Sequence, residues 1–170
     1  YDARGRWVHQ RSWNGWGEPT YNKESDAIES WLEYSSRRQI VARISGDGHG
    51  NRINDADGVG IRRYQADSAG NYVGQTYFTK DGEPTTSALG CHRLTMPHDK
   101  LGRRVEKRCY GVDGGPANNT SGIHLTKTTW GPGDKKLEVM SLDLLGKPAT
   151  GSDGVFRHRW RYEDDRLVEE

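Results

Sequence analysis

Apolar residues in this chain occur in short runs, separated by stretches rich in glycine, asparagine and aspartate. Examples are YVGQTYF at 72–78, RVEKRCY at 104–110 and CHRLTM at 91–96. These runs have the length of strands and contain β-branched and aromatic residues, so the pattern predicts β-strands. Val73 and Tyr77 lie on one side of their strand, and Tyr72 and Phe78 lie on the other. Either the sheet curls and covers part of both faces, or one face presents aromatic side chains to a partner.

The pattern of glycine and apolar positions repeats about every 32 residues, which indicates a tandem repeat architecture. A proline follows the first glycine of the pattern by two positions in most repeats. Three columns of the repeat keep this spacing: Gly50, Gly82, Gly114 and Gly146, preceded by Gly17; Gly58, Gly90, Gly122 and Gly154; and Val8, Val41, Val73, Val105 and Leu137.

Each repeat is expected to contain two strands and two turns. KDGEP at 80–84 places glycine where a turn needs positive φ, followed by a proline that cannot continue a strand ladder. DSAGN at 67–71 and DKLGR at 99–103 begin with aspartate and have glycine fourth, which is typical of a turn that closes a hairpin. The predicted repeats span residues 1–34, 35–66, 67–98, 99–130 and 131–162, with a partial repeat at 163–170.

The predicted fold is therefore all-β, with a single β-repeat domain over residues 1–170. About five two-stranded repeats form an antiparallel meander, and this meander makes an elongated twisted or curled sheet. The segment 22–34 departs most from the pattern, because Ile28 and Trp31 have helical spacing and permit a short helix. The alternative is a strand, in which Ile28 and Trp31 align with Ile61 and Tyr64.

Composition narrows the function classes. Only 32% of residues are apolar, but six Trp and eight Tyr are present, so we expect a thin, ordered structure packed largely by aromatic residues. The net charge of +1 gives no long-range attraction for nucleic acid, and no nucleic-acid partner is expected. No apolar run reaches the ~20 residues of a membrane-spanning helix, so no membrane-spanning segment is expected.

Four segments carry a family resemblance: YDARGR, ADSAGNYVGQTYFTKDGEP, HDKLGRRVEKRCYGVDGGP and YEDDRLVEE. They resemble the tandem Tyr-Asp repeats, which are relatives of the RHS and YD repeats of many bacterial surface and extracytoplasmic proteins. The resemblance covers nearly the whole chain. It implies an all-β repeat architecture and a mostly non-catalytic role as a shell, stalk or docking surface. It also implies an extracytoplasmic location in a bacterium, in the periplasm or at the cell surface.

Candidate metal and catalytic residues do not form a convincing pattern. The acidic segment NDADG at 54–58 lacks the EF-hand ligands, because Ile53 and Tyr64 stand where oxygen ligands are needed. His92 and His124 share a column, but equivalent residues are two strands, or ~9.6 Å, apart. Zinc requires its nitrogen ligands at ~2.1 Å. No strand-nucleophile-helix motif or phosphate loop is present, so we expect no enzyme, metal or cofactor.

Two groups of residues are candidates for structural or binding roles. Cys91 and Cys109 flank the turn at DKLG, so they are expected to lie close together. A disulfide needs Cβ atoms ~3.8 Å apart, and the spacing leaves open whether they form a disulfide or two packed thiols. Trp13, Trp130 and Trp160 either bind a glycan or a protein partner, or pack within the thin sheet.

The function predicted from these features is a non-catalytic β-repeat scaffold that binds another protein or protein complex. We expect it to be an accessory subunit of a larger extracytoplasmic or membrane-associated assembly, because an open meander exposes edge strands that need a partner. The alternative is a carbohydrate-binding repeat module that uses exposed aromatic residues.

Overall fold

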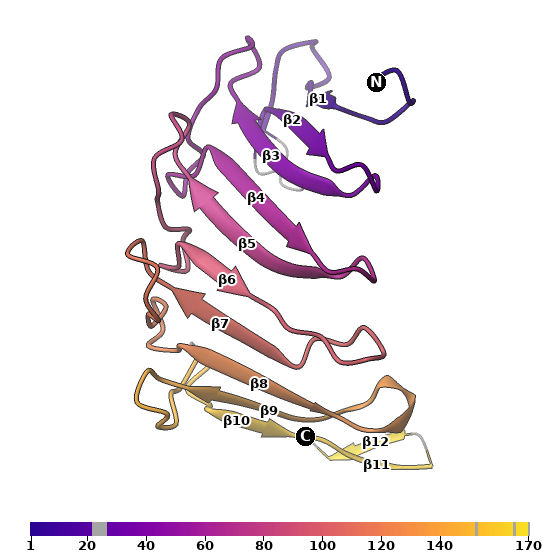
Figure 1. Ribbon diagram of the computed structural model, residues 1–170, viewed down its shortest axis with the longest axis vertical. Helices are drawn as coiled ribbons and strands as arrows, with labels where there is room; N and C mark the ends of the chain where they lie inside the picture. Colours follow the sequence, from indigo (N-terminus) through magenta and orange to yellow (C-terminus); the bar gives the residue numbers. More distant parts are fainter. Residues whose placement is uncertain (22–26, 152, 165, 170) are drawn as a thin grey trace.

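The computed structural model describes residues 1–21, 27–151, 153–164 and 166–169, and shows one open, elongated sheet (Figure 1). Ten strands pair in chain order, each antiparallel to the next, so the predicted all-β meander is confirmed. A separate two-stranded sheet follows, and a 3-10 turn, η1 (Pro132–Asp134), precedes β9. The strands are β1 (His9–Arg11), β2 (Glu29–Tyr34), β3 (Ile40–Gly46), β4 (Ile61–Ala66), β5 (Tyr72–Phe78), β6 (Arg93–Thr95), β7 (Glu106–Tyr110), β8 (Leu125–Trp130), β9 (Lys136–Leu142), β10 (Arg157–Arg159), β11 (Arg161–Glu163) and β12 (Arg166–Glu169).

A five-residue turn recurs along the chain, and residues 67–71 show why the sequence forms it. The Gly70 N–H donates to the Asp67 carbonyl oxygen (3.2 Å), and the Asp67 N–H donates to the Asn71 carbonyl oxygen (3.0 Å). Gly70 has a φ of 99°, a left-handed conformation that glycine adopts without steric cost. The Asp67 carboxylate accepts hydrogen bonds from the side-chain amide and the backbone N–H of Asn71, and these bonds lower its pKa. Aspartate first and glycine fourth therefore specify the turn.

Three such turns are found in each of the middle repeats, so the prediction of two was wrong. In the central repeat the turns contain Gly70, Gly82 and Gly90, and all three glycines have positive φ. The additional turn belongs to the column Gly58, Gly90, Gly122 and Gly154. A bridge between Phe78 and Pro84 closes one turn, and the next turn leads into β6. The long connections at one end of the strands are thus built from two turns each (Figure 1).

The strand register separates the side chains into two faces. One face carries Tyr77, Leu94 and Cys109. Leu94 lies opposite both Gln75 and Cys109, and Tyr77 points to the same side as Gln75 because the two are two positions apart on β5. We name this the disulfide face. The other face carries Arg63, Thr76, Arg93 and Tyr110, because Thr76 lies opposite both arginines and Arg93 lies opposite Tyr110; we name it the arginine face.

The core of the middle repeats lies on the disulfide face and is thin. It consists of Val59, Tyr77, Cys91, Leu94 and Cys109, each at most 5% exposed, with Ala117 packed against them. Burial of Tyr77 raises the pKa of its hydroxyl. The core lies at the end of the strands where each connection contains two turns. These connections cover apolar side chains that a flat sheet would expose to water.

The N-terminal repeat contains a strand at 29–34, so the predicted strand is confirmed there and the helix is wrong; residues 22–26 lie outside the described residues. The predicted alignment was wrong by one position. Leu32 lies opposite Arg43 as Tyr64 lies opposite Gln75, so Leu32, and not Trp31, is equivalent to Tyr64. Since successive residues of a strand point to opposite faces, Trp31 belongs to the arginine face.

Candidate functional site

The three predicted tryptophans lie on separate elements. Trp13 follows β1 and is 53% exposed. Trp130 ends β8, and its Nε1–H donates to the Arg104 carbonyl oxygen (2.9 Å). Trp160 follows β10 and stacks on His158, with 5.9 Å between ring centroids. Within the described part of the chain, no ring contact joins two of these tryptophans. They therefore do not form one aromatic ladder, and a binding role for them stays a prediction.

Exposed aromatic residues gather instead around β1, the first edge of the sheet. Trp16 is 88% exposed at the turn after β1, and Trp7 is 44% exposed just before it. Among the described residues, the large exposed aromatics outside this region are Tyr72 and Phe156. Only one member of this group, Trp13, was predicted as a binding residue, although the density of aromatics in residues 1–21 is visible in the sequence. We name the group the N-terminal aromatic edge: Tyr1, Trp7, Trp13, Trp16 and Tyr21.

A buried carboxylate holds this edge on the sheet. Glu29 on β2 is 1% exposed and accepts hydrogen bonds from His9 Nε2 (2.6 Å), Arg11 Nη2 (2.7 Å) and the Gly50 N–H (3.0 Å). Burial by itself would raise the pKa of Glu29, but the hydrogen bonds and the positive charge of Arg11 outweigh it and lower the pKa. His9 also stacks on Trp31, with 5.8 Å between ring centroids. β1 is only three residues long, so these side-chain contacts are a large part of its attachment.

Cations stand over aromatic rings along the arginine face. The Cζ atom of Arg63 lies 5.7 Å from the centroid of Phe78, and that of Arg93 lies 4.1 Å from the centroid of Tyr110. At the N-terminal end, Arg11 stands over Trp13 at 5.5 Å. Contacts of this kind are attractive because the face of the ring carries partial negative charge. We name these three pairs the arginine–aromatic row: Arg11 with Trp13, Arg63 with Phe78, and Arg93 with Tyr110.

The second repeat supplies its ring to this face in a different way. Gly46 stands at the position that Phe78 and Tyr110 occupy in the following repeats. The indole of Trp31 covers it, and a Cβ atom added to Gly46 would lie 2.6 Å from Trp31 Cζ3. A ring from the neighbouring strand thus replaces the missing one, which explains both the glycine and the tryptophan.

The two histidines of the repeated column hold the connections to the sheet. His92 Nδ1–H donates to the Thr85 carbonyl oxygen (2.8 Å), and His124 Nδ1–H donates to the carbonyl oxygens of Cys109 and Ala117 (2.9 and 3.1 Å). Each ring also meets an aromatic ring edge to face: His92 meets Phe78, and His124 meets Tyr110. Their recurrence is therefore explained by loop attachment and ring packing.

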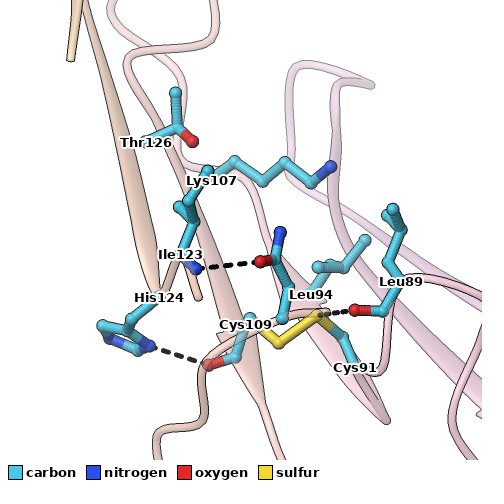
Figure 2. A pocket seen from close by; sticks show the side chains of 9 residues that line it. Leu89, Cys91, Leu94, Lys107, Cys109, Ile123, His124 and Thr126 are labelled. Atoms are coloured by element: carbon cyan, nitrogen blue, oxygen red, sulfur yellow. Dashed lines mark hydrogen bonds between the residues drawn. A yellow bond between two sulfur atoms is a disulfide. The ribbon is translucent and has the colours of Figure 1, made fainter. Parts of the chain in front are cut away.

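Cys91 and Cys109 form a disulfide between the segment that enters β6 and strand β7 (Figure 2). Their Cα atoms are 5.4 Å apart, and both residues are buried. Of the two alternatives that the spacing left open, the structure thus has the bridge. One repeat earlier, Val59 and Tyr77 occupy the equivalent positions in the same core, so the disulfide replaces an apolar pair.

A small cavity of about 30 Å³ lies beside the disulfide. Leu89, Leu94, Lys107 and Ile123 are among the side chains that line it (Figure 2). Burial, with a contribution from the charge of Arg104, lowers the pKa of Lys107. A volume of this size holds a water molecule or two, and no larger ligand fits without rearrangement.

The acidic loop at 54–58 has a structural explanation. The Asp55 carboxylate accepts the N–H groups of Asp57 and Val59 and pairs with Arg62. Within the ranges that the structure describes, no group of three or more His, Cys, Asp or Glu side chains is placed to bind a metal ion.

Comparison with protein-family models and with curated proteins found no match for this chain. In the described ranges, no helix has the length and apolar character required to cross a membrane.

Proposed function

We propose that this protein is a non-catalytic β-repeat scaffold that binds another protein through its N-terminal aromatic edge. The observation that carries the proposal is the coincidence of two features at β1. Among the strands that the structure describes, β1 pairs with β2 alone, so one side of its backbone has no strand partner there. The same strand is surrounded by Trp7, Trp13 and Trp16, all of them exposed.

Both features favour a protein partner. An unpaired sheet edge offers backbone donors and acceptors that a second chain can continue by strand addition. Tryptophan and tyrosine are enriched at the centres of protein interfaces, because they bury a large apolar area at a small cost in side-chain entropy. Exposed indoles beside an open edge combine backbone pairing with apolar anchoring.

We further propose that the protein works outside the cytoplasm of a bacterium, as an accessory part of a larger assembly. The disulfide supports an oxidising compartment, since disulfides are rare in cytosolic proteins. The resemblance to tandem Tyr-Asp repeats supports the same location.

The experiment is affinity purification of the tagged protein from its native cells after brief cross-linking, with the bound proteins identified by mass spectrometry. We expect a specific partner that is lost when Trp13 and Trp16 are both changed to serine. The matched control changes Leu101 and Leu145 to serine, because these side chains are 73% and 78% exposed and lie away from β1. Equal recovery of the partner by both variants would contradict the proposal.

A second candidate function is carbohydrate binding, and the exposure of Trp13 and Trp16 is the observation that favours it. Indole faces that are open to solvent can stack on sugar rings, whereas Trp130 is held between two cations and a backbone carbonyl. A glycan array separates the two functions. Carbohydrate binding that is lost in the Trp13 and Trp16 variant and kept in a Trp130→Ala variant would favour the second candidate.

A further inference from the structure

We propose that the arginine face binds an extended acidic segment of a partner protein, with Arg63 and Arg93 as the residues that receive its carboxylates. This inference deepens the proposed scaffold function and rests on it, since it names the chemistry of a second contact with a protein partner.

The two arginines are held ready to accept carboxylates. Arg93 stands 4.1 Å over the ring of Tyr110, and Arg63 stands 5.7 Å over the ring of Phe78. A guanidinium group stacked on a ring keeps its N–H edges available for a forked hydrogen bond to a carboxylate. Because the aromatic ring restricts the side chain, less conformational entropy is lost on binding.

These two arginines also differ from their neighbours in charge compensation. Three other arginines of this face have carboxylate partners: Arg11 pairs with Glu29, Arg108 with Glu106, and Arg159 with Glu138. For Arg63 and Arg93, the structure shows no ion pair with any described residue, and each has a ring contact instead. The middle of the face therefore carries two positive charges without compensation, which is complementary to an acidic partner.

The spacing of the two charges indicates the shape of the partner segment. Arg63 on β4 and Arg93 on β6 both lie opposite Thr76 on β5, so they are two strand spacings, or ~9.6 Å, apart. A polyproline II segment has three residues per turn and rises ~3.1 Å per residue, so its side chains recur on one side every ~9.3 Å. Acidic residues three positions apart in such a segment match the two arginines when the segment crosses the strands.

The coverage of the rings favours a protein segment over a polysaccharide. Sugar rings stack on open aromatic faces, but here a guanidinium stands over each ring, and His92 or His124 meets the ring edge to face. The groups that remain for a ligand are mainly N–H donors, and these suit carboxylates on a flexible chain.

The test is fluorescence anisotropy with a fluorescein-labelled peptide of repeated Glu-Pro-Pro units. We expect binding by the wild type that weakens with salt. Changing Arg63 and Arg93 to glutamine should weaken it at least about tenfold, because charge-assisted hydrogen bonds are lost. A control with Arg52→Gln and Arg104→Gln removes the same charge from two exposed arginines outside the proposed site and should bind like the wild type. Circular dichroism establishes that each variant is folded.

Other outcomes overturn the proposal. It fails if the wild type does not bind the peptide, if a Gln-Pro-Pro peptide binds equally well, or if both double variants bind alike. It also fails if polygalacturonate binds through the two arginines and the peptide does not. An Arg93→Lys variant, which keeps the charge and loses the fork, should bind with intermediate affinity and replaces the double variant if that variant is unfolded.

This test is independent of the test of the N-terminal aromatic edge. The Trp13 and Trp16 variant should bind the peptide normally even though it loses its cellular partner. If only the peptide experiment fails, the proposal that the arginine face binds an acidic segment is wrong, and the proposed scaffold function is unaffected.

Discussion

At the residue scale, the carboxylate of Glu29 joins three parts of the N-terminal repeat: β1, β2 and the turn that contains Gly50. Hydrogen bonds from His9, Arg11 and the Gly50 N–H reach it, and the Glu29 side chain itself is buried. A buried charge with partners is costly to disturb, because the partners lose their hydrogen bonds while they stay partly desolvated. This residue therefore controls how firmly the N-terminal aromatic edge is attached.

We predict that Glu29→Gln lowers the free energy of unfolding by about 2 kcal/mol at neutral pH. The folded-state pKa of Glu29 lies below its ordinary value of 4.5, so the carboxylate stabilises the fold above that pH. This contribution is lost as the pH falls through the lowered pKa. The difference between wild type and variant, measured by urea unfolding, should therefore shrink in acid.

The matched control for this prediction is Glu33→Gln, which changes an exposed carboxylate on the same strand. Asp2 and Asp67 also have lowered pKa values, so the wild type loses stability in acid for several reasons. Only the difference between the Glu29 and Glu33 variants isolates the buried group. A difference that stays constant with pH would contradict the interpretation.

At the element scale, the hairpin of β6 and β7 is the one described hairpin that a covalent bond reinforces. Strand β6 has three residues, and the core beside it consists of a few side chains. Cys91 and Cys109 are 18 residues apart, and a cross-link over such a loop restricts mainly the unfolded chain. The disulfide thus compensates for a short strand in a thin part of the sheet.

We predict that reduction lowers the free energy of unfolding by about 3 kcal/mol. Urea unfolding with and without dithiothreitol measures the effect. A Cys91→Val, Cys109→Ala variant keeps apolar side chains at both positions and should resemble the reduced protein, with no response to the reductant. Equal stability of the oxidised and reduced wild type would show that the bridge contributes little.

At the scale of the whole molecule, the sheet is a linear array in which each strand contacts mainly its neighbours in the chain. The stability of such an array is close to a sum of repeat terms and interface terms between neighbouring repeats. Equivalent turns lie one period apart, as the turn containing Gly114 and the turn containing Gly146 do. The chain after one turn could therefore follow the other turn without a change in strand register.

We predict that deletion of residues 111–142, one full period, leaves a folded sheet that is shorter by ~9.6 Å and contains the disulfide. Deletion of residues 111–126, half a period, should prevent folding, because it joins positions that have different roles in the repeat. Far-UV circular dichroism and small-angle X-ray scattering distinguish the products. Comparable folding of the two deletions would mean that the period does not set the register.

Much of the fold was predictable because its signals are local. Glycine at the fourth position of a turn adopts positive φ without strain, so the glycine columns marked the turns, and the 32-residue period marked the meander. The third turn of each repeat was missed, although its glycine column was recognised, because it does not directly join two long strands. The candidate site was less predictable. In the arginine–aromatic row, Phe78 and Tyr110 recur in one column of the repeat, but Arg63 and Arg93 come from different columns.

The sequence by itself determined that this chain forms tandem β-hairpins, because turn residues and strand-length runs act over a few neighbouring residues. Only the tertiary structure decided which side chains share a face and meet across strands. The physical reason is the two-residue period of a strand, since a shift of one position moves every side chain to the opposite face. The register of β2 and β3 places Trp31 over Gly46. The register of β6 and β7 places Arg93 over Tyr110 and leaves its guanidinium available to a partner.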